Sequence, residues 1–194
     1  MVKPIMDEGN VIIRQAHPDD VEGIAYVHFR TWQTTYTGLM PDEIIQGLDI
    51  NRNRKYWTKN LTSTEEKFVH TKTFVAIAEE SRDADIKKGQ IVGFINGGKN
   101  RDPKFNVDGE IYAIYILKEM QGKEIGRKLF NSMLEFLKSE KLSSMIIWVL
   151  KNNSASKFYS KMGGLPKEEK IDLRGSHQLY EIGYVWSNIS DILL

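Results

Sequence analysis

The chain has 194 residues, which suits one domain with a hydrophobic core of ordinary size. Lysine and arginine number 27 and aspartate and glutamate 26, so the charge indicates neither nucleic acid nor an acidic membrane surface as a partner. There is no cysteine, which excludes disulfides, zinc–thiolate sites and a cysteine nucleophile. The N-terminal residues show no apolar core of signal-peptide length, and no apolar run approaches the roughly 20 residues of a membrane span. We therefore expect a single cytoplasmic domain over residues 1–194.

Hydrophobic periodicity and turn residues predict alternating strands and helices along the whole chain. In chain order we expect a strand at 11–16, helices at 18–32 and 41–60 (the second broken near 47–49), strands at 73–80, 90–98 and 108–117, a helix from 125 to 137, a strand at 144–150, a helix at 153–162, and strands at 168–173 and 176–186.

The strand–helix–strand unit over residues 108–150 determines the fold class. Such a unit requires a right-handed crossover between parallel strands, whereas the hairpins around it are antiparallel. The continuous apolar run at 144–150 is typical of a strand that is covered on both faces. We expect an α/β (α+β) domain: a mixed, mostly antiparallel sheet of six or seven strands, with helices on both faces and one parallel βαβ unit.

The segment KEMQGKEIGRKLF, residues 118–130, joins a predicted strand to a predicted helix. The first N–H groups of a helix have no partner within the helix, and the helix dipole favours an anion near them. The spacing is neither that of a Walker loop nor Gly-x-Gly-x-x-Gly. By itself the segment fits either a phosphate site or an ordinary glycine-containing turn with a solvated basic face.

Three motifs together resemble those of the GNAT N-acetyltransferase superfamily. The turn is similar to the family pattern Gln/Arg-x-x-Gly-x-Gly/Ala, with Gln121 and Gly126 at its ends and Glu124 in place of the middle glycine. The later family motif, Asn-x-x-Ala-x-x-Phe-Tyr-x-x-x-Gly, is matched by Asn152, Ala155, Phe158, Tyr159 and Gly163. The N-terminal part resembles a bacterial branch that carries Trp-x-x-x-Tyr-x-Gly-x-x-Pro, here Trp32, Tyr36, Gly38 and Pro41.

This resemblance implies acetyl-CoA as co-substrate. Its pyrophosphate would lie on the N–H groups of the turn, and its pantetheine arm would pair like an extra strand in a splay between strands 108–117 and 144–150. Asn152 would hydrogen-bond the arm, or alternatively cap a helix. The implied cofactor-binding residues are Ile114, Ile116, Gln121, Gly122, Lys123, Glu124, Ile125, Gly126, Arg127, Asn152 and Tyr159.

Glu124 is the residue of the turn that departs from the family pattern. Because glutamate tolerates positive φ poorly, we expect an ordinary helical backbone at Glu124 and a carboxylate that points away from the pyrophosphate. In that position the carboxylate would also interact favourably with the positive end of the helix dipole.

The resemblance further implies direct acetyl transfer to an amine in a ternary complex, and the lack of cysteine agrees with it. An alkylamine has a pKa of roughly 10, so it has to lose a proton before it attacks. Glu110 is the candidate base, directly or through water; the alternative is an exposed charge at a strand end. Tyr159 is the candidate acid for the leaving thiolate; the alternative is a packing role.

The acceptor would be a small-molecule amine or a peptide N-terminus. It would bind between the first two helices and the last strands. Candidate residues there, each of which is otherwise a packing residue, are Trp32, Tyr36 and His28, with Trp57 and Tyr180 as further aromatic side chains. We expect no metal, because the four histidines lack ligand spacing. A CoA-binding sensor without turnover, an unrelated nucleotide-phosphate-binding protein, and a homodimer through the C-terminal strands or tail are left open.

Overall fold

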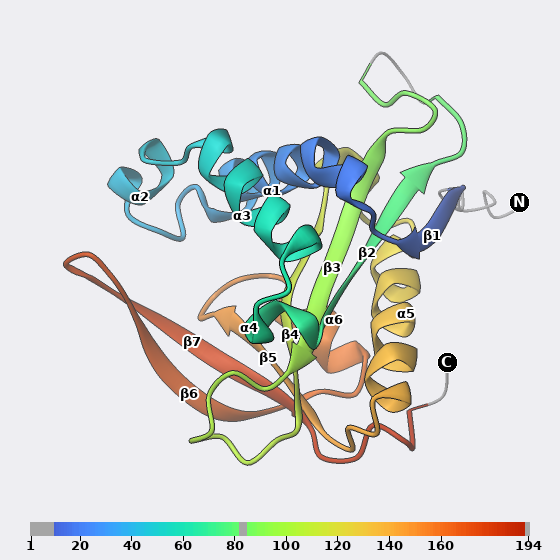
Figure 1. Ribbon diagram of the computed structural model, residues 1–194. Helices are drawn as coiled ribbons and strands as arrows, with labels where there is room; N and C mark the ends of the chain where they lie inside the picture. Colours follow the sequence, from blue (N-terminus) through green and yellow to red (C-terminus); the bar gives the residue numbers. More distant parts are fainter. Residues whose placement is uncertain (1–9, 82–84, 193–194) are drawn as a thin grey trace, which may run out of the picture.

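The computed structural model describes residues 10–81 and 85–192. Figure 1 shows these residues as one mixed sheet with helices packed against it. Residues 1–9, on which the expectation about a signal segment rests, lie outside the described ranges, as does part of the charged loop between the two strands of the predicted hairpin.

Seven strands form a single sheet in the order β1-β2-β3-β4-β5-β7-β6. Neighbouring strands are antiparallel except β4 and β5, which run parallel. The strands are β1 Val11–Gln15, β2 Thr71–Ala78, β3 Ile91–Lys99, β4 Gly109–Ile116, β5 Met145–Leu150, β6 Leu165–Arg174 and β7 His177–Trp186. The structure thus confirms the predicted mixed sheet with one parallel βαβ unit.

Helices lie on both faces of this sheet, as predicted (Figure 1). The helical region expected at 41–60 is indeed interrupted, and α2 ends at Gln46 before α3 begins at Ile50. The sequence did not predict the short helix α4. The helices are α1 Val21–Tyr36, α2 Asp42–Gln46, α3 Ile50–Thr62, α4 Glu66–Val69, α5 Ile125–Ser139 and α6 Ser156–Lys161, with 3₁₀ turns at Pro18–Asp20 and Lys118–Met120.

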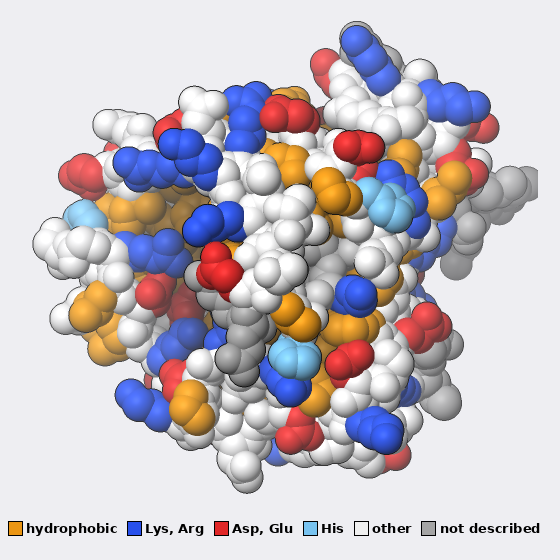
Figure 2. Space-filling view, in the orientation of Figure 1, with side chains coloured by type: hydrophobic (Ala, Val, Ile, Leu, Met, Phe, Trp, Pro, Cys, Tyr) orange, Lys and Arg blue, Asp and Glu red, His pale blue; other side chains and the backbone are white. Residues whose placement is uncertain are grey.

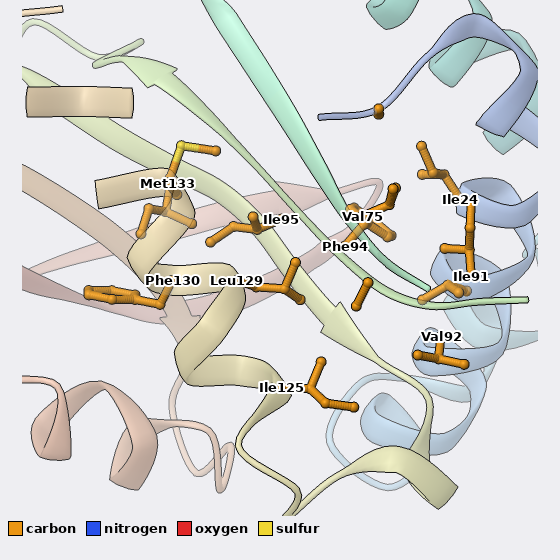
Figure 3. Packing of buried hydrophobic residues seen from close by; sticks show 14 of the residues in the cluster. Ile24, Val75, Ile91, Val92, Phe94, Ile95, Ile125, Leu129, Phe130 and Met133 are labelled. Carbon is orange, nitrogen blue, oxygen red and sulfur yellow. The ribbon is translucent and has the colours of Figure 1, made fainter. Parts of the chain in front are cut away.

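The core lies on both sides of β3, whose residues 91–98 are all buried. Ile125, Leu129 and Met133 recur every four residues along α5 and form its buried stripe. Figure 3 shows these side chains on one side of the sheet and Ile24 of α1 on the other, with Phe94 on β3 among the packed residues. Because β3 is covered on both faces, side chains at its odd-numbered and even-numbered positions alike are buried.

The parallel strands β4 and β5 separate after a short paired stretch. Their pairing is confined to residues 109–111 of β4 and 145–147 of β5, although both strands continue beyond it. A bulge in β4, between Ile111 and Ala113, interrupts its register with β3 just after this stretch. The result is the splay that the resemblance led us to expect.

Within the described ranges, no helix combines the length and apolar character needed to cross a membrane. The same residues contain no group of three or more His, Asp or Glu side chains that could hold a metal ion.

Candidate active site

A cleft of about 690 Å³ opens at the ends of β4 and β5, where these strands diverge. The turn before α5, helix α6 and the C-terminal half of α1 complete its walls. The cleft brings together most of the predicted cofactor residues and one acceptor residue: Tyr36, Ile114, Ile116, Gln121, Gly122, Glu124, Gly126, Arg127 and Tyr159. The predicted residues outside its lining are His28, Trp32, Glu110, Lys123, Ile125 and Asn152.

The turn before α5 presents a row of unpaired backbone N–H groups. None of the N–H groups from Gly122 to Arg127 donates a hydrogen bond to another described residue. Gln121 Nε2 donates to the carbonyl oxygen of Ile116 at 3.0 Å and so ties the turn to the end of β4. A Cβ atom at Gly126 would lie 3.4 Å from Ile116 and from the ring of Phe158. The glycine therefore lets α5 pack closely here, and the free N–H groups suit a pyrophosphate.

Glu124 does not have the helical backbone that we expected. Its φ is 57° and its ψ is 1°, which is the left-handed conformation. The turn therefore requires positive φ at the position where the family pattern has glycine, and glutamate adopts it at a cost in strain. Its carboxylate is 60% exposed and lies 3.5 Å from Nε of Arg127, so a neighbouring cation partly offsets its charge.

Tyr159 reaches the cleft from α6, with only 5% of its surface exposed. Burial raises the pKa of its phenol above the usual value, so the hydroxyl is protonated at neutral pH. It can therefore donate a hydrogen bond or a proton to a group in the cleft.

Asn153, rather than Asn152, lines the cleft. Asn152 is exposed, with a left-handed φ of 73°. Asn153 is 4% exposed, and its Oδ1 accepts a hydrogen bond from the N–H of Ala155 at 2.9 Å. The motif assigned the binding role to Asn152, whereas the tight turn after β5 makes its neighbour Asn153 face the cleft.

Glu110 lies at the paired end of β4, whereas the cleft opens at the other end of that strand. Its buried carboxylate accepts three hydrogen bonds from Arg101, from Nη2 at 2.5 Å, Nε at 3.0 Å and the backbone N–H at 3.1 Å. The expectation that Glu110 is either the base or an exposed charge does not fit this placement. Its carboxylate is buried and pairs with the half-exposed side chain of Arg101, and neither residue lines the cleft.

Aromatic side chains line the part of the cleft next to α1. The hydroxyl oxygens of Tyr36 and Tyr115 lie 3.4 Å apart, and both residues line the cleft. His28 stacks on the Tyr115 ring at 5.2 Å and accepts a hydrogen bond from Trp57 Nε1 at 3.1 Å. Burial lowers the pKa of His28 to about 4, so the imidazole is neutral and supports Tyr115 from behind. Trp32 packs edge-on against Tyr36, with ring centroids 5.0 Å apart.

Two further aromatic candidates lie elsewhere. Trp57 is 1% exposed and belongs to the core, whereas Tyr180 is 55% exposed on the hairpin of β6 and β7.

Thr31 is a residue of the cleft that the sequence did not predict. It lines the cleft, and its buried hydroxyl has no hydrogen-bond partner among the described residues.

Glu181 on β7 is a carboxylate near the cleft that the sequence motifs did not reveal. Its side chain is 19% exposed and lies 3.3 Å from Nζ of Lys170, which in turn lies 4.1 Å from the ring centre of the cleft residue Trp148. Burial raises the pKa of Glu181. Burial also raises the pKa values of Tyr36 and Tyr115, and the nearby charge of Glu181 adds to this effect. An isolated acid within the apolar run LYEIGYVW was the available signal.

Figure 2 shows the region between α2 and the hairpin of β6 and β7 as a hollow on the left of the molecule. Hydrophobic side chains form its floor, and charged side chains of both signs stand around its margin.

A sheet that splays around a cleft, with free helix N–H groups at its edge, is the framework of a CoA-dependent acyltransferase. The chain belongs to the acetyltransferase (GNAT) family, whose model matches residues 32–164. It is 31% identical over 183 residues to the uncharacterized N-acetyltransferase YuaI of Bacillus subtilis, which covers 93% of this chain and 95% of that protein. It is thus an acetyl-CoA-dependent acetyltransferase.

Solved structures with the same fold include two that were determined with the CoA group. The PaiA N-acetyltransferase of Thermoplasma acidophilum, in complex with coenzyme A, has a TM-score of 0.63 and 19% identity, covering 89% of this chain and 98% of that one. YncA of Salmonella typhimurium, with its cofactor acetyl-CoA, has a TM-score of 0.63 and 16% identity, and the match covers 95% of this chain and 97% of that one. At these identities the likeness shows the fold.

Proposed function

We propose that the protein transfers the acetyl group of acetyl-CoA directly to a primary amine of a small molecule or a peptide N-terminus, within a ternary complex. The observation that carries this proposal is a single cleft lined both by the turn at Gly122–Arg127 and by the aromatic pair Tyr36 and Tyr115. One cleft of this kind can hold donor and acceptor together. The sequence contains no cysteine that could form an acyl-enzyme.

The residues of the turn fit the pyrophosphate of acetyl-CoA. The N–H groups from Gly122 to Arg127 would hold its oxygens, and the side chains of Arg127, Lys118 and Lys157, which also line the cleft, would add positive charge. The edges of β4 and β5 that face each other without pairing, beyond residues 111 and 147, would accommodate the pantetheine arm. Acetyl-CoA supplies an activated acetyl thioester.

The acceptor amine has to lose a proton, and Glu181 is the group we propose to receive it, directly or through the Tyr36–Tyr115 hydroxyl pair. Its raised pKa makes it a better base than an ordinary glutamate at neutral pH. The amine nitrogen forms a bond to the acetyl carbon while the carbon–sulfur bond breaks. The phenol of Tyr159 donates the proton that the departing thiolate takes up, and the second proton that the nitrogen loses on becoming an amide restores the phenol.

A CoA-release assay with acetyl-CoA tests this proposal against a panel of polyamines, aminoglycosides, amino acids and peptides with free N-termini. At least one amine should stimulate release, and Tyr159→Phe should lower turnover by about 10²-fold with little change in CoA affinity. Tight CoA binding without release from any acceptor would instead support a regulatory or sensor protein. Unchanged turnover in Tyr159→Phe would remove this tyrosine from the mechanism.

A further inference from the structure

Strand β6 is the free edge of the sheet (Figure 1), and exposed apolar side chains lie on it and on its neighbour β7. Ile171, Leu173 and Tyr180 on the hairpin are 50%, 68% and 55% exposed. Ile171 is directly opposite Tyr180 in the pairing of β6 with β7, so these two side chains share one face. A long unpaired edge next to exposed apolar side chains is suited to pairing with another strand.

The regular part of this edge runs over residues 168–174 and is centred on Ile171. The register slips between Pro166 and Glu168, and proline has no N–H to donate, so regular pairing cannot extend past this point. The N–H of Lys151 donates to the carbonyl of Tyr180 at 2.8 Å, so the backbone groups of Tyr180 face β5. Ile171 and Tyr180 are therefore a non-hydrogen-bonded pair of the β6–β7 ladder. In such a pair the backbone groups of both residues point outward, so the N–H and C=O of Ile171 point to the free edge.

Four charged side chains lie on the face of β6 opposite to that of Ile171. They are Glu168, Lys170, Asp172 and Arg174. Their charges alternate in sign along the strand, so the pattern is complementary to that of a second copy running in the opposite direction. If two copies pair antiparallel about Ile171, each Glu168 is opposite the Arg174 of the other copy, and each Lys170 is opposite the other Asp172. Opposite charges in direct cross-strand positions stabilise a pair of strands, and like charges destabilise it.

The neighbouring registers are unfavourable. An axis at residue 170 places Lys170 opposite its own copy and Glu168 opposite Asp172. An axis at residue 172 places Asp172 opposite its own copy and Lys170 opposite Arg174. The charge pattern therefore discriminates against both slips, as expected of a specified interface.

The ion pairs that these side chains form within one chain do not prevent them from forming further ion pairs with a second copy. Lys170 lies 3.3 Å from Glu181 and Arg174 lies 2.7 Å from Asp172, but ammonium and guanidinium groups have further donors. Glu168 forms no salt bridge with any described residue. Its carboxylate is available to a partner.

We propose that the protein forms a homodimer in which the β6 strands of two copies pair antiparallel about a two-fold axis at Ile171. The axis is perpendicular to the sheet, so each face of the sheet continues across the interface. Ile171 contacts its symmetry mate beside the two Tyr180 rings. This inference does not depend on the acetyl acceptor.

Sedimentation velocity of the whole chain over a wide concentration range tests the dimer. The mass should be twice the 22.4 kDa of one chain. Ile171→Glu places two carboxylates at the axis and should reduce the mass to that of a monomer. The matched control is Ile12→Glu, which alters a 52% exposed isoleucine on β1, the opposite edge strand, and should leave the dimer intact.

A charge exchange tests the register. Glu168→Arg and Arg174→Glu, taken singly, should each raise the dimer dissociation constant at least about tenfold. The double variant restores opposite charges and should recover affinity. Circular dichroism melts of each variant would verify folding. A wild-type monomer at all concentrations, dissociation by Ile12→Glu but not by Ile171→Glu, or a folded double variant as weak as the single ones would overturn the proposal.

Discussion

The left-handed backbone of Glu124 predicts a measurable difference between two substitutions at this position. A non-glycine residue in this conformation is strained by about 1–2 kcal/mol, whereas glycine costs about 0.5–1 kcal/mol in chain entropy. The exposed ion pair with Arg127 contributes at most about 1 kcal/mol, and both substitutions remove it. Glu124→Gly should therefore unfold with a free energy about 0.5–1 kcal/mol higher than that of Glu124→Ala.

The same two variants test how the carboxylate affects the cofactor. A charge about 6 Å from one phosphate charge in water raises the energy by roughly 0.7 kcal/mol, which is about threefold in affinity. Both variants remove this charge, so both should bind CoA about threefold more tightly than the wild type. Urea denaturation measures the first difference, and calorimetric titration with CoA measures the second.

The stability difference and the change in CoA affinity can each be refuted independently of the other. Equal stabilities of the alanine and glycine variants would mean that residue 124 is not left-handed in solution. Weaker CoA binding by both variants would mean that the Glu124 carboxylate supports the turn instead of opposing the phosphates.

Three further predictions concern ionisable groups. Glu181→Gln should lower kcat and remove the acidic limb of the pH–rate profile without altering CoA affinity; an unchanged profile would exclude Glu181 as the base. Wild-type stability should fall by up to about 3 kcal/mol as the pH drops from 6.5 towards 4, because the unfolded imidazole of His28 takes up a proton before the folded one, with its pKa of about 4. Urea denaturation at each pH should show that the free energy of unfolding depends less on pH in His28→Phe than in the wild type. Equal pH dependence in the two proteins would refute the assignment of this effect to His28. Glu110→Gln should lower the free energy of unfolding by about 1.5–3 kcal/mol while the folded enzyme keeps its kcat, and a specific loss of kcat would return Glu110 to the catalytic machinery.

The elements that local sequence defines were predicted well. The helical periodicity of the apolar residues in α5 and the glycines at 122 and 126 are local features of the sequence, so the βαβ unit and its turn could be placed from sequence. Glu124 shows the limit of such reasoning. Its side chain favours a helical backbone, but the tertiary position of the turn imposes a positive φ.

The carboxylates near the site could not be assigned from sequence, because their roles depend on tertiary partners. The resemblance suggested Glu110 as the base, yet Arg101 engages its carboxylate away from the cleft. Glu181 matches no motif, and its proximity to Tyr36 and Tyr115 arises only when β7 packs beside β5. Electrostatic environment is a property of the folded chain and does not follow from spacing.

Calorimetric titration of the wild-type protein with CoA, repeated in the presence of inorganic pyrophosphate, tests the central claim most directly. The claim is that the cleft between β4 and β5 binds CoA through the N–H groups of the turn at Gly122–Arg127. One CoA should bind per chain, and pyrophosphate should weaken its apparent affinity by competing for those groups. An absence of binding heat with CoA at several temperatures, or binding that pyrophosphate leaves unchanged, would contradict the account.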